Sequence, residues 1–109
     1  MDPLPDKRGA PEKKIERAIM EALRQRGWFV KKMHGSIYQA GFPDLFACHK
    51  EIGIRLIEVK LPGMIGSKFT KAQIVVFREL TLNGAGVWVL TSVEDILKLA
   101  ERPNWTHYL

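Results

Sequence analysis

The chain has 109 residues, of which 46% are hydrophobic and 27% are charged. This length suits one globular domain with a single core and excludes two domains. No apolar stretch is long enough to span a bilayer. Seventeen Lys and Arg residues against twelve Asp and Glu residues give a net charge of +5. Such a surplus favours polyanions such as DNA, RNA or acidic membranes without choosing among them.

The one cysteine, Cys48, lies in an apolar run, where it is expected to be a small core residue. A lone cysteine excludes an internal disulfide framework and is compatible with a reducing compartment. The first residues contain no apolar segment of the kind found in signal peptides. We therefore expect an intracellular protein.

The N-terminal quarter of the chain predicts an arm followed by a helix. Residues 1–10 combine two prolines, a glycine and mixed charges, which indicates a flexible arm. Apolar residues recur with helical spacing over 11–26, and Gly27 ends this predicted amphipathic helix. Glu12 falls at the edge of the apolar stripe, whereas Glu21 falls on the opposite, solvated face.

Three strands are expected next. The first runs from Trp28 to Met33, and a glycine-containing loop follows it. The second covers residues 45–49 and the third residues 54–60, with a turn between them. Both are almost continuously apolar, which is typical of strands that are covered on both faces of a sheet.

A second helix and a fourth strand follow. Thr70 and Gln73 have the spacing of a capping box, which starts a helix that Gly84 or Gly86 ends. Residues 87–90 are expected to form the fourth strand.

The end of the chain predicts one more helix and a tail. Ser92 and Asp95 are expected to cap a helix that runs to about Ala100. We take 11–101 as the domain and 102–109 as a C-terminal tail, whose aromatic residues pack back or contact a partner. The order α-β-β-β-α-β-α, with hairpin-like links between the first three strands and a helical crossover to the fourth, predicts an α/β fold in which helices flank a small mixed sheet.

Two acids and a lysine stand at the ends of strands that are otherwise apolar. Alternation along a strand sends Glu58 and Lys60 to one face, about 6.6 Å apart. Asp44 begins the neighbouring strand, so its carboxylate is expected beside them. Ionised side chains are rarely buried unless something pairs or coordinates them. The pattern therefore predicts a metal site that cleaves phosphodiester bonds.

Each part of such a site has a candidate. Carboxylate oxygens are ligands that Mg²⁺ prefers, and the backbone carbonyl of Val59 offers another. Mg²⁺ or Mn²⁺ would offset charge on the phosphate and activate water, while Lys60 would steady the nucleophile or the phosphate. Glu12, Gln73 or both would orient the water or the metal shell. No phosphate-binding glycine motif or nucleophile elbow is present, so nucleotide binding and serine hydrolase chemistry have little support.

These residues resemble a known family. Their order is similar to that of the PD-(D/E)XK nuclease superfamily, and the nearest pattern is that of its virus-type replication-repair nuclease branch, VRR-NUC. The resemblance spans roughly residues 11–98 and rests on these segments: Glu12, Arg26-Gly27-Trp28, Ala40-Gly41-Phe42-Pro43-Asp44, Glu58-Val59-Lys60 and Phe69-Thr70-Lys71-Ala72-Gln73.

The resemblance implies a restriction-endonuclease-like αβββαβα core and a Mg²⁺- or Mn²⁺-dependent endodeoxyribonuclease. Asp44 and Glu58 would bind the metal, to which Glu12 would be a further candidate ligand. Lys60 would be catalytic, and Glu12 and Gln73 would complete the site. The resemblance further implies branched DNA such as Holliday junctions as substrate, a role in replication, recombination or repair, and a homodimer. It points to the cytoplasm of a bacterial or phage-infected cell. The sequence itself, with no spanning apolar stretch and no phosphate-binding glycine motif, predicts neither a membrane partner nor a nucleotide cofactor.

The helical acid has two candidates. Glu16 is the alternative to Glu12, because resolvase-like relatives place this glutamate nearer the following glycine. We favour Glu12, because it lies nearer the centre of the apolar stripe and its separation from Gly27 resembles the VRR-NUC pattern. Gln73 also has a second explanation, since a capping role accounts for it without catalysis.

Polar residues around the proposed cleft are candidates for DNA contacts. A solvated basic face is the alternative for the lysines, and turn formation for the loop hydroxyls. Lys32 is the best candidate. The proposed contacts are Lys32, His34, Ser36, Tyr38, Lys68 and Lys71, and Lys31 also flanks the cleft.

Two rival functions remain open at this point. One is a nickase or restriction-like nuclease on ordinary duplex DNA, which a parallel test of junction and duplex would separate. The other is a catalytically silent nucleic-acid-binding module, which predicts salt-sensitive binding without cleavage. The complete set of two acids and a lysine argues against the second, because a binding module has no need of acids that face phosphates.

Overall fold

The computed structural model describes residues 10–33, 40–64 and 68–109. The elements in chain order are α1 (Ala10–Gln25), β1 (Phe29–Lys32), β2 (Leu45–His49), β3 (Gly53–Val59), η2 (Pro62–Met64), α2 (Lys71–Leu82), β4 (Val87–Leu90), η3 (Val93–Ala100) and η4 (Trp105–Tyr108). The η elements are 3₁₀ turns. The expected succession of a helix, three strands, a helix and a fourth strand is confirmed, and 3₁₀ structure replaces the last helix.

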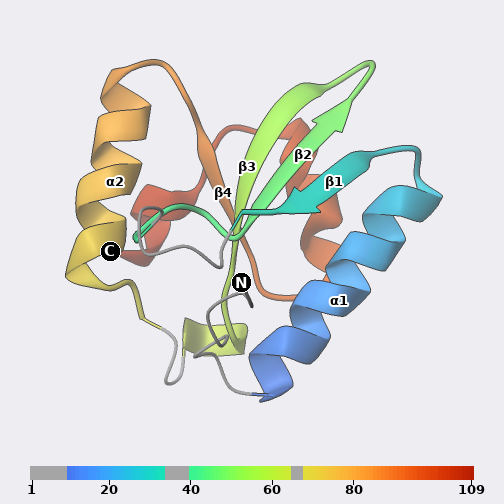
Figure 1. Ribbon diagram of the computed structural model, residues 1–109, viewed down its shortest axis with the longest axis horizontal. Coiled ribbons are helices and arrows are strands. Elements are labelled where there is room, and N and C mark those ends of the chain that lie inside the picture. The colour runs from blue at the N-terminus through green and yellow to red at the C-terminus, as the bar shows by residue number, and fades with distance from the viewer. Residues whose placement is uncertain (1–9, 34–39, 65–67) are drawn as a thin grey trace, which may run out of the picture.

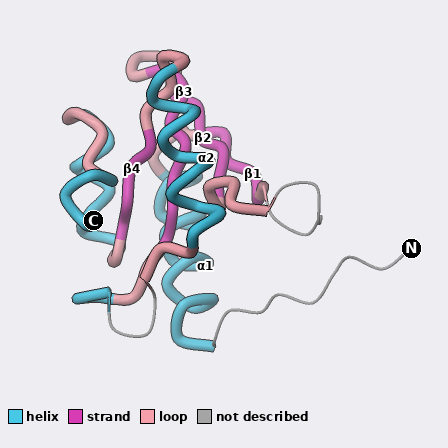
Figure 2. The backbone as a smooth tube through the Cα atoms, turned by 90° about the vertical axis from the view of Figure 1, so that its left-hand side faces the viewer, coloured by secondary structure: helices cyan, strands magenta, loops and turns pink. Residues whose placement is uncertain are grey.

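The strands form one mixed sheet in the order β1-β2-β3-β4 (Figure 1). β2 pairs antiparallel with β1 and β3, whereas β3 and β4 are parallel and are joined through α2. Figure 2 shows β1 and β4 at opposite edges of this sheet. The hairpin-like links and the helical crossover expected from the sequence are therefore confirmed, and the fold is an α/β restriction-endonuclease-like core.

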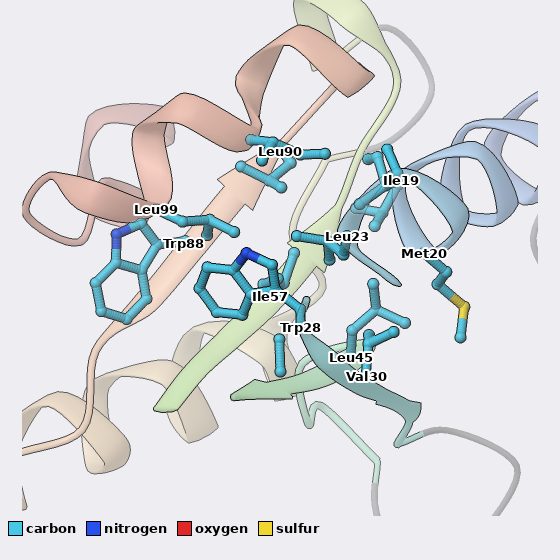
Figure 3. Close-up of a cluster of buried hydrophobic side chains, with 14 residues drawn as sticks. Ile19, Met20, Leu23, Trp28, Val30, Leu45, Ile57, Trp88, Leu90 and Leu99 are labelled. Atoms are coloured by element: carbon cyan, nitrogen blue, oxygen red, sulfur yellow. The ribbon is translucent and has the colours of Figure 1, made fainter. Parts of the chain in front are cut away.

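The main core lies between one face of the sheet and the elements α1 and η3 (Figure 3). Its helical contribution comes from Ile19 and Leu23, which are both fully buried. Alternation along the strands explains why Ile57 and Trp88 face this side while their neighbours face the other. Burial of this apolar surface is the main term that holds α1 on the sheet.

A second cluster covers the other face of β4. Phe77 of α2 packs edge-on against Trp105 of η4, with ring centroids 5.7 Å apart. Val87 and Val89 complete the cluster from β4. The side-chain amide of Asn104 bonds to both the N–H and the C=O of Val89, at 2.6 and 3.1 Å. This side chain therefore pairs with the backbone of β4 at the edge of the sheet.

Both helices end at a glycine with a positive φ, a backbone conformation that glycine adopts easily. Gly27 has a φ of 85°, and Trp28 and Gly27 donate their backbone N–H groups to Leu23 and Arg24, which is the Schellman pattern. The Trp28 N–H is therefore used in capping α1, and β1 is shorter than the predicted strand from Trp28 to Met33. Gly84, with a φ of 94°, ends α2.

Two further expectations are wrong. Ser92 makes no side-chain cap, because the carboxylate of Asp95 accepts from the N–H and hydroxyl of Thr91 instead, and tight 3₁₀ turns follow. The two central strands are also not covered on both faces. Ile54 in β3 is 57% exposed, because α2 lies toward the other end of β3.

None of the helices in the described ranges has the length and apolarity needed to cross a bilayer.

Candidate functional site

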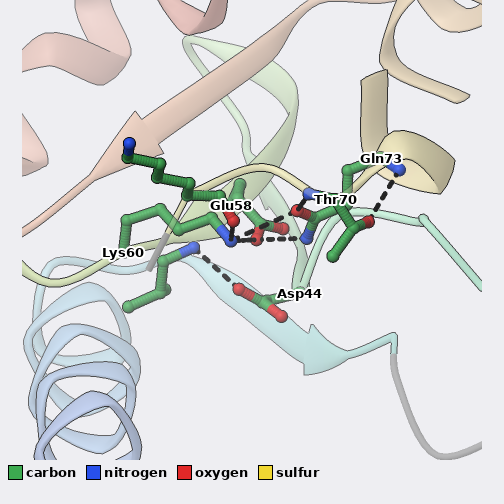
Figure 4. A network of polar contacts seen from close by, with 7 residues as sticks. Asp44, Glu58, Lys60, Thr70 and Gln73 are labelled. Atoms are coloured by element: carbon green, nitrogen blue, oxygen red, sulfur yellow. Dashed lines mark hydrogen bonds and ion pairs between the residues drawn. The ribbon is translucent and has the colours of Figure 1, made fainter. Parts of the chain in front are cut away.

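Four side chains from three parts of the fold meet at one end of the sheet (Figure 4). Asp44 lies directly before β2, Glu58 lies near the end of β3, and Lys60 follows that strand. Gln73 comes from the first turn of α2. All but Gln73 are at most 6% exposed, so the fold buries two acids and an ammonium group together.

Glu58 and Lys60 lie on the same face of the sheet, as alternation predicted. The Lys60 ammonium lies 3.1 Å from Glu58 Oε2. It also donates to Gln73 Oε1 at 3.2 Å and to the backbone carbonyl of Lys68 at 3.3 Å. An ammonium has three N–H donors, so each has a partner here. Lys60 would have to give up one of these partners before it could donate to any further group.

Gln73 caps α2 and also contacts the charged side chains of this cluster. Its Oε1 accepts from the Thr70 N–H at 3.0 Å, and its N–H donates to Thr70 Oγ1 at 3.1 Å, which is a complete capping box. Its Nε2 donates to Glu58 Oε2 at 2.7 Å. The cap fixes the amide at the first turn of α2, and the amide then bridges Glu58 and Lys60.

Asp44 is tied to the end of β3 through the backbone. Its Oδ2 accepts from the Val59 N–H at 2.8 Å, and its own C=O accepts from the Met33 N–H at 2.7 Å. These bonds hold the carboxylate beside the residues that flank Val59. Since Asp44 precedes β2, the antiparallel pairing of β2 with β3 brings it here.

The surroundings of Glu58 disfavour the charged form of its carboxyl group. Burial and the nearby negative charge of Asp44 raise the pKa of Glu58 from 4.5 to about 8, although Lys60 and Gln73 act to lower it. Glu58 Oε1 is buried and has no hydrogen-bond partner in the described part of the chain. A buried carboxylate oxygen without a partner is costly unless a cation or a proton compensates it.

The donor set therefore fits a hard divalent cation held by few protein ligands. Asp44 and Glu58 would supply carboxylate oxygens, and the Val59 carbonyl is a further candidate from the same turn. Among the described residues, no three His, Cys, Asp or Glu side chains converge into a full ligand set. Mg²⁺ commonly binds through one or two carboxylates and keeps several waters, which agrees with so sparse a set.

Both candidate helical acids are buried. Glu12 is 7% exposed and Glu16 is 1% exposed, and they continue the buried stripe of Ile19 and Leu23 toward the N-terminus of α1. The carboxylate of Glu16 lies 3.5 Å from the Lys32 ammonium. The buried stripe of α1 therefore does not include Ile15, which is only partly buried. Since both acids are buried, burial does not decide which of them belongs to the site.

Phe69 supports the site, although the sequence analysis gave it no role. The Lys60 ammonium lies 5.6 Å from the centre of its ring, within the range of a cation–π contact. Phe69 in turn packs edge-on against Phe77 and Trp105. An aromatic residue directly before a helix cap is a recognised signal for packing against that helix, and it could have pointed to Phe69.

The proposed DNA contacts are spread over several elements. Lys32 ends β1 and is half-exposed, and Lys71 is exposed at the start of α2. Lys68 is exposed, and its backbone carbonyl holds Lys60. The remaining candidates, His34, Ser36 and Tyr38, lie outside the described residues.

Comparison with known proteins gives one informative likeness. No protein-family model and no curated protein matches the chain. A solved structure described as a "VRR_NUC domain" matches with a TM-score of 0.62 and 25% sequence identity, over 84% of this chain and 95% of that one.

Proposed function

We propose that this chain, a VRR-NUC domain by its fold, is a divalent-metal-dependent nuclease of the PD-(D/E)XK type that hydrolyses DNA. The observation that carries the proposal is the cluster of the buried side chains of Asp44, Glu58 and Lys60 with the amide of Gln73. A structural domain gains little from two acids with one unpaired oxygen, whereas a phosphodiesterase needs them.

Each side chain has a part in this chemistry. Asp44 and Glu58 would hold Mg²⁺ or Mn²⁺, which when bound supplies charge neutralisation for the phosphate and acidifies water. Lys60 would donate to the phosphate or to the attacking water, and its pre-set position limits reorganisation during the reaction. Gln73 would position Lys60 and Glu58 through its two amide atoms. Glu12 or Glu16 would orient metal-bound water from α1.

The finer assignments extend the same proposal. We take DNA with branches, such as Holliday junctions, as the preferred substrate, in replication, recombination or repair. Two cuts across a junction require two sites, which a twofold dimer supplies most simply. The half-exposed apolar face of β1 and β3, where Phe29 and Ile54 lie, offers a surface for such a dimer.

The direct test is cleavage of labelled four-way junction and linear duplex of matched sequence, with Mg²⁺, with Mn²⁺ and with EDTA. We expect cutting of the junction only with metal, and a loss of at least about 100-fold in the Asp44→Asn variant. Asparagine keeps the shape of Asp44 and an oxygen to accept from the Val59 N–H, so the fold is retained.

The matched control is Glu94→Gln, which removes an exposed acid in η3. It should cut like the wild type. Equal activity of wild type and Asp44→Asn would exclude the proposed metal site. Faster cutting of duplex than of junction would favour a restriction-like nuclease, and tight binding without any cutting would favour a binding module.

A further inference from the structure

A basic groove lies between α1 and β1, outside the cluster of buried acids. It has a volume of about 890 Å³ and is open to solvent. Arg17 and Arg24 of α1 and Lys32 of β1 contribute positive charge to its wall, and Glu21 is the one acid in its lining. Lys31 also lines it, but its ammonium lies 6.0 Å from the Phe29 ring, away from α1.

The groove begins at the candidate site. Lys32 lies opposite Leu45 in the sheet, so it is one residue from Asp44 along the ladder. The Lys32 ammonium lies 3.5 Å from Glu16, which belongs to the buried stripe of α1. From there α1 and β1 converge toward the turn at Gly27 (Figure 1). The cations thus mark a path that leads away from the buried acids.

The spacing of the two arginines suits a nucleic-acid backbone. Arg17 and Arg24 are two helical turns apart on one face, about 10.5 Å along the axis of α1. The two side chains are therefore far enough apart to contact different phosphates of one strand. Both side chains are exposed, and guanidinium groups match phosphate oxygens in two-pronged geometry.

We propose that this groove holds the phosphate backbone of the DNA strand that extends beyond the cleaved bond, with Arg17 and Arg24 as its phosphate contacts. The inference rests on the proposed nuclease function, because it assigns the path of that substrate. Glu21 lies between the arginines and opposes binding by its charge. The groove therefore contributes to affinity and placement of the substrate, while the chemistry stays with the buried cluster.

The test measures binding apart from cleavage. Fluorescence anisotropy of a labelled four-way junction in EDTA, over a series of salt concentrations, gives the salt dependence of the association constant. Loss of two phosphate contacts in the double variant Arg17→Gln/Arg24→Gln should reduce the log–log salt slope by about 1.8 and weaken binding roughly tenfold or more. The charge-conserving Arg17→Lys/Arg24→Lys variant should keep the wild-type slope.

Two controls separate the groove from net charge. Lys50→Gln/Arg102→Gln removes the same charge from exposed sites, of which Lys50 lies at the far end of β2 from Asp44, and it should bind like the wild type. Glu21→Gln should tighten binding, whereas Glu51→Gln, at the β2–β3 turn, should not.

An unchanged salt slope in Arg17→Gln/Arg24→Gln, or an equal loss in Lys50→Gln/Arg102→Gln, would overturn the groove assignment even if the wild type cuts DNA. Displacement of the junction by polyglutamate as readily as by unlabelled DNA would overturn it in favour of an acidic peptide. Groove-dependent binding by a wild type that never cuts would support the groove and contradict only the nuclease function.

Discussion

Glu58 shows how a single residue connects the fold to its chemistry. It lies in the strand between Ile57 and Val59, both fully buried, where alternation turns it toward α2. One of its oxygens bonds to Gln73 and pairs with Lys60, and the other has no partner within the described residues. The protein without metal therefore holds an acid whose charged form is disfavoured.

This electrostatic cost predicts how stability depends on pH. Since burial and Asp44 raise the pKa of Glu58 to about 8 in the folded protein, the folded state keeps a proton that the unfolded chain releases near its ordinary pKa of 4.5. The free energy of unfolding without metal should therefore fall as pH rises from about 5 to about 8.

Urea unfolding in EDTA at several pH values measures this dependence. The Glu58→Gln variant has no proton to release, so its stability should change less over the same window. A wild-type stability that rises with pH in parallel with that of Glu58→Gln would contradict the assignment.

Gln73 both caps α2 and contacts Lys60 and Glu58. A pair of variants distinguishes these two roles. Gln73→Ala removes the bonds to Lys60 and Glu58 together with half of the capping box, and we expect kcat to fall by roughly 10- to 100-fold. Thr70→Ala removes only the side-chain cap, at a cost of about 1 kcal/mol in stability, and kcat should change little. Steady-state cleavage and thermal melting of both variants are the measurements. Equal losses of kcat would mean that Gln73 acts only as a cap.

At the level of elements, the placement of α2 depends on a close contact with the segment before β2. Gly41 has a φ of 83°, and a Cβ atom there would lie 2.5 Å from the Ala72 carbonyl oxygen. The backbone at Gly41 therefore contacts the backbone of α2 at Ala72, one residue before Gln73. This contact sets how near the amide lies to Glu58.

The contact predicts a different cost for the same substitution at two glycines. Gly41→Ala meets both a disfavoured φ and the Ala72 carbonyl, so it should destabilise the fold by about 2–4 kcal/mol. Gly84→Ala has a similarly positive φ of 94° but nothing within 4 Å of its Cβ, and about 1 kcal/mol is expected. Guanidinium unfolding of both variants gives the comparison. Equal costs would show that α2 moves away from Gly41 without penalty.

At the scale of the whole molecule, the sheet is covered unequally. Among the described elements, α1 and η3 cover one face, whereas α2 and η4 cover the other face near β4 and the end of β3. Phe29 and Ile54 remain 56% and 57% exposed on the open part, with Phe46 beside Phe29 at a centroid distance of 6.4 Å. An open apolar sheet face of this kind is typical of a surface that a second copy covers.

The proposed dimer can be tested on this face. Ile54→Lys places a charge in the open apolar face and should shift a wild-type dimer toward monomer in sedimentation equilibrium. Leu97→Lys places the same charge on η3, where Leu97 is 79% exposed, and should leave the dimer intact. A wild type that stays monomeric at all concentrations would exclude the dimer. Equal dissociation by both variants would place its interface elsewhere.

The sequence by itself determined the elements and the residues of the candidate site. Periodicity, glycines and the capping box are local signals, so they located α1, β2, α2 and β4 to within one or two residues. Alternation is local as well, and it placed Glu58 and Lys60 on one face. The resemblance to VRR-NUC rested on these same short segments.

Only the tertiary structure decided what surrounds those residues. Contacts between Phe69 and Lys60, the burial of both Glu12 and Glu16, and the basic groove along α1 depend on how distant elements pack. A local pattern states which face of a strand or helix is apolar, but not whether another element covers it. For that reason the sequence predicted two fully covered central strands, and the fold left Ile54 exposed.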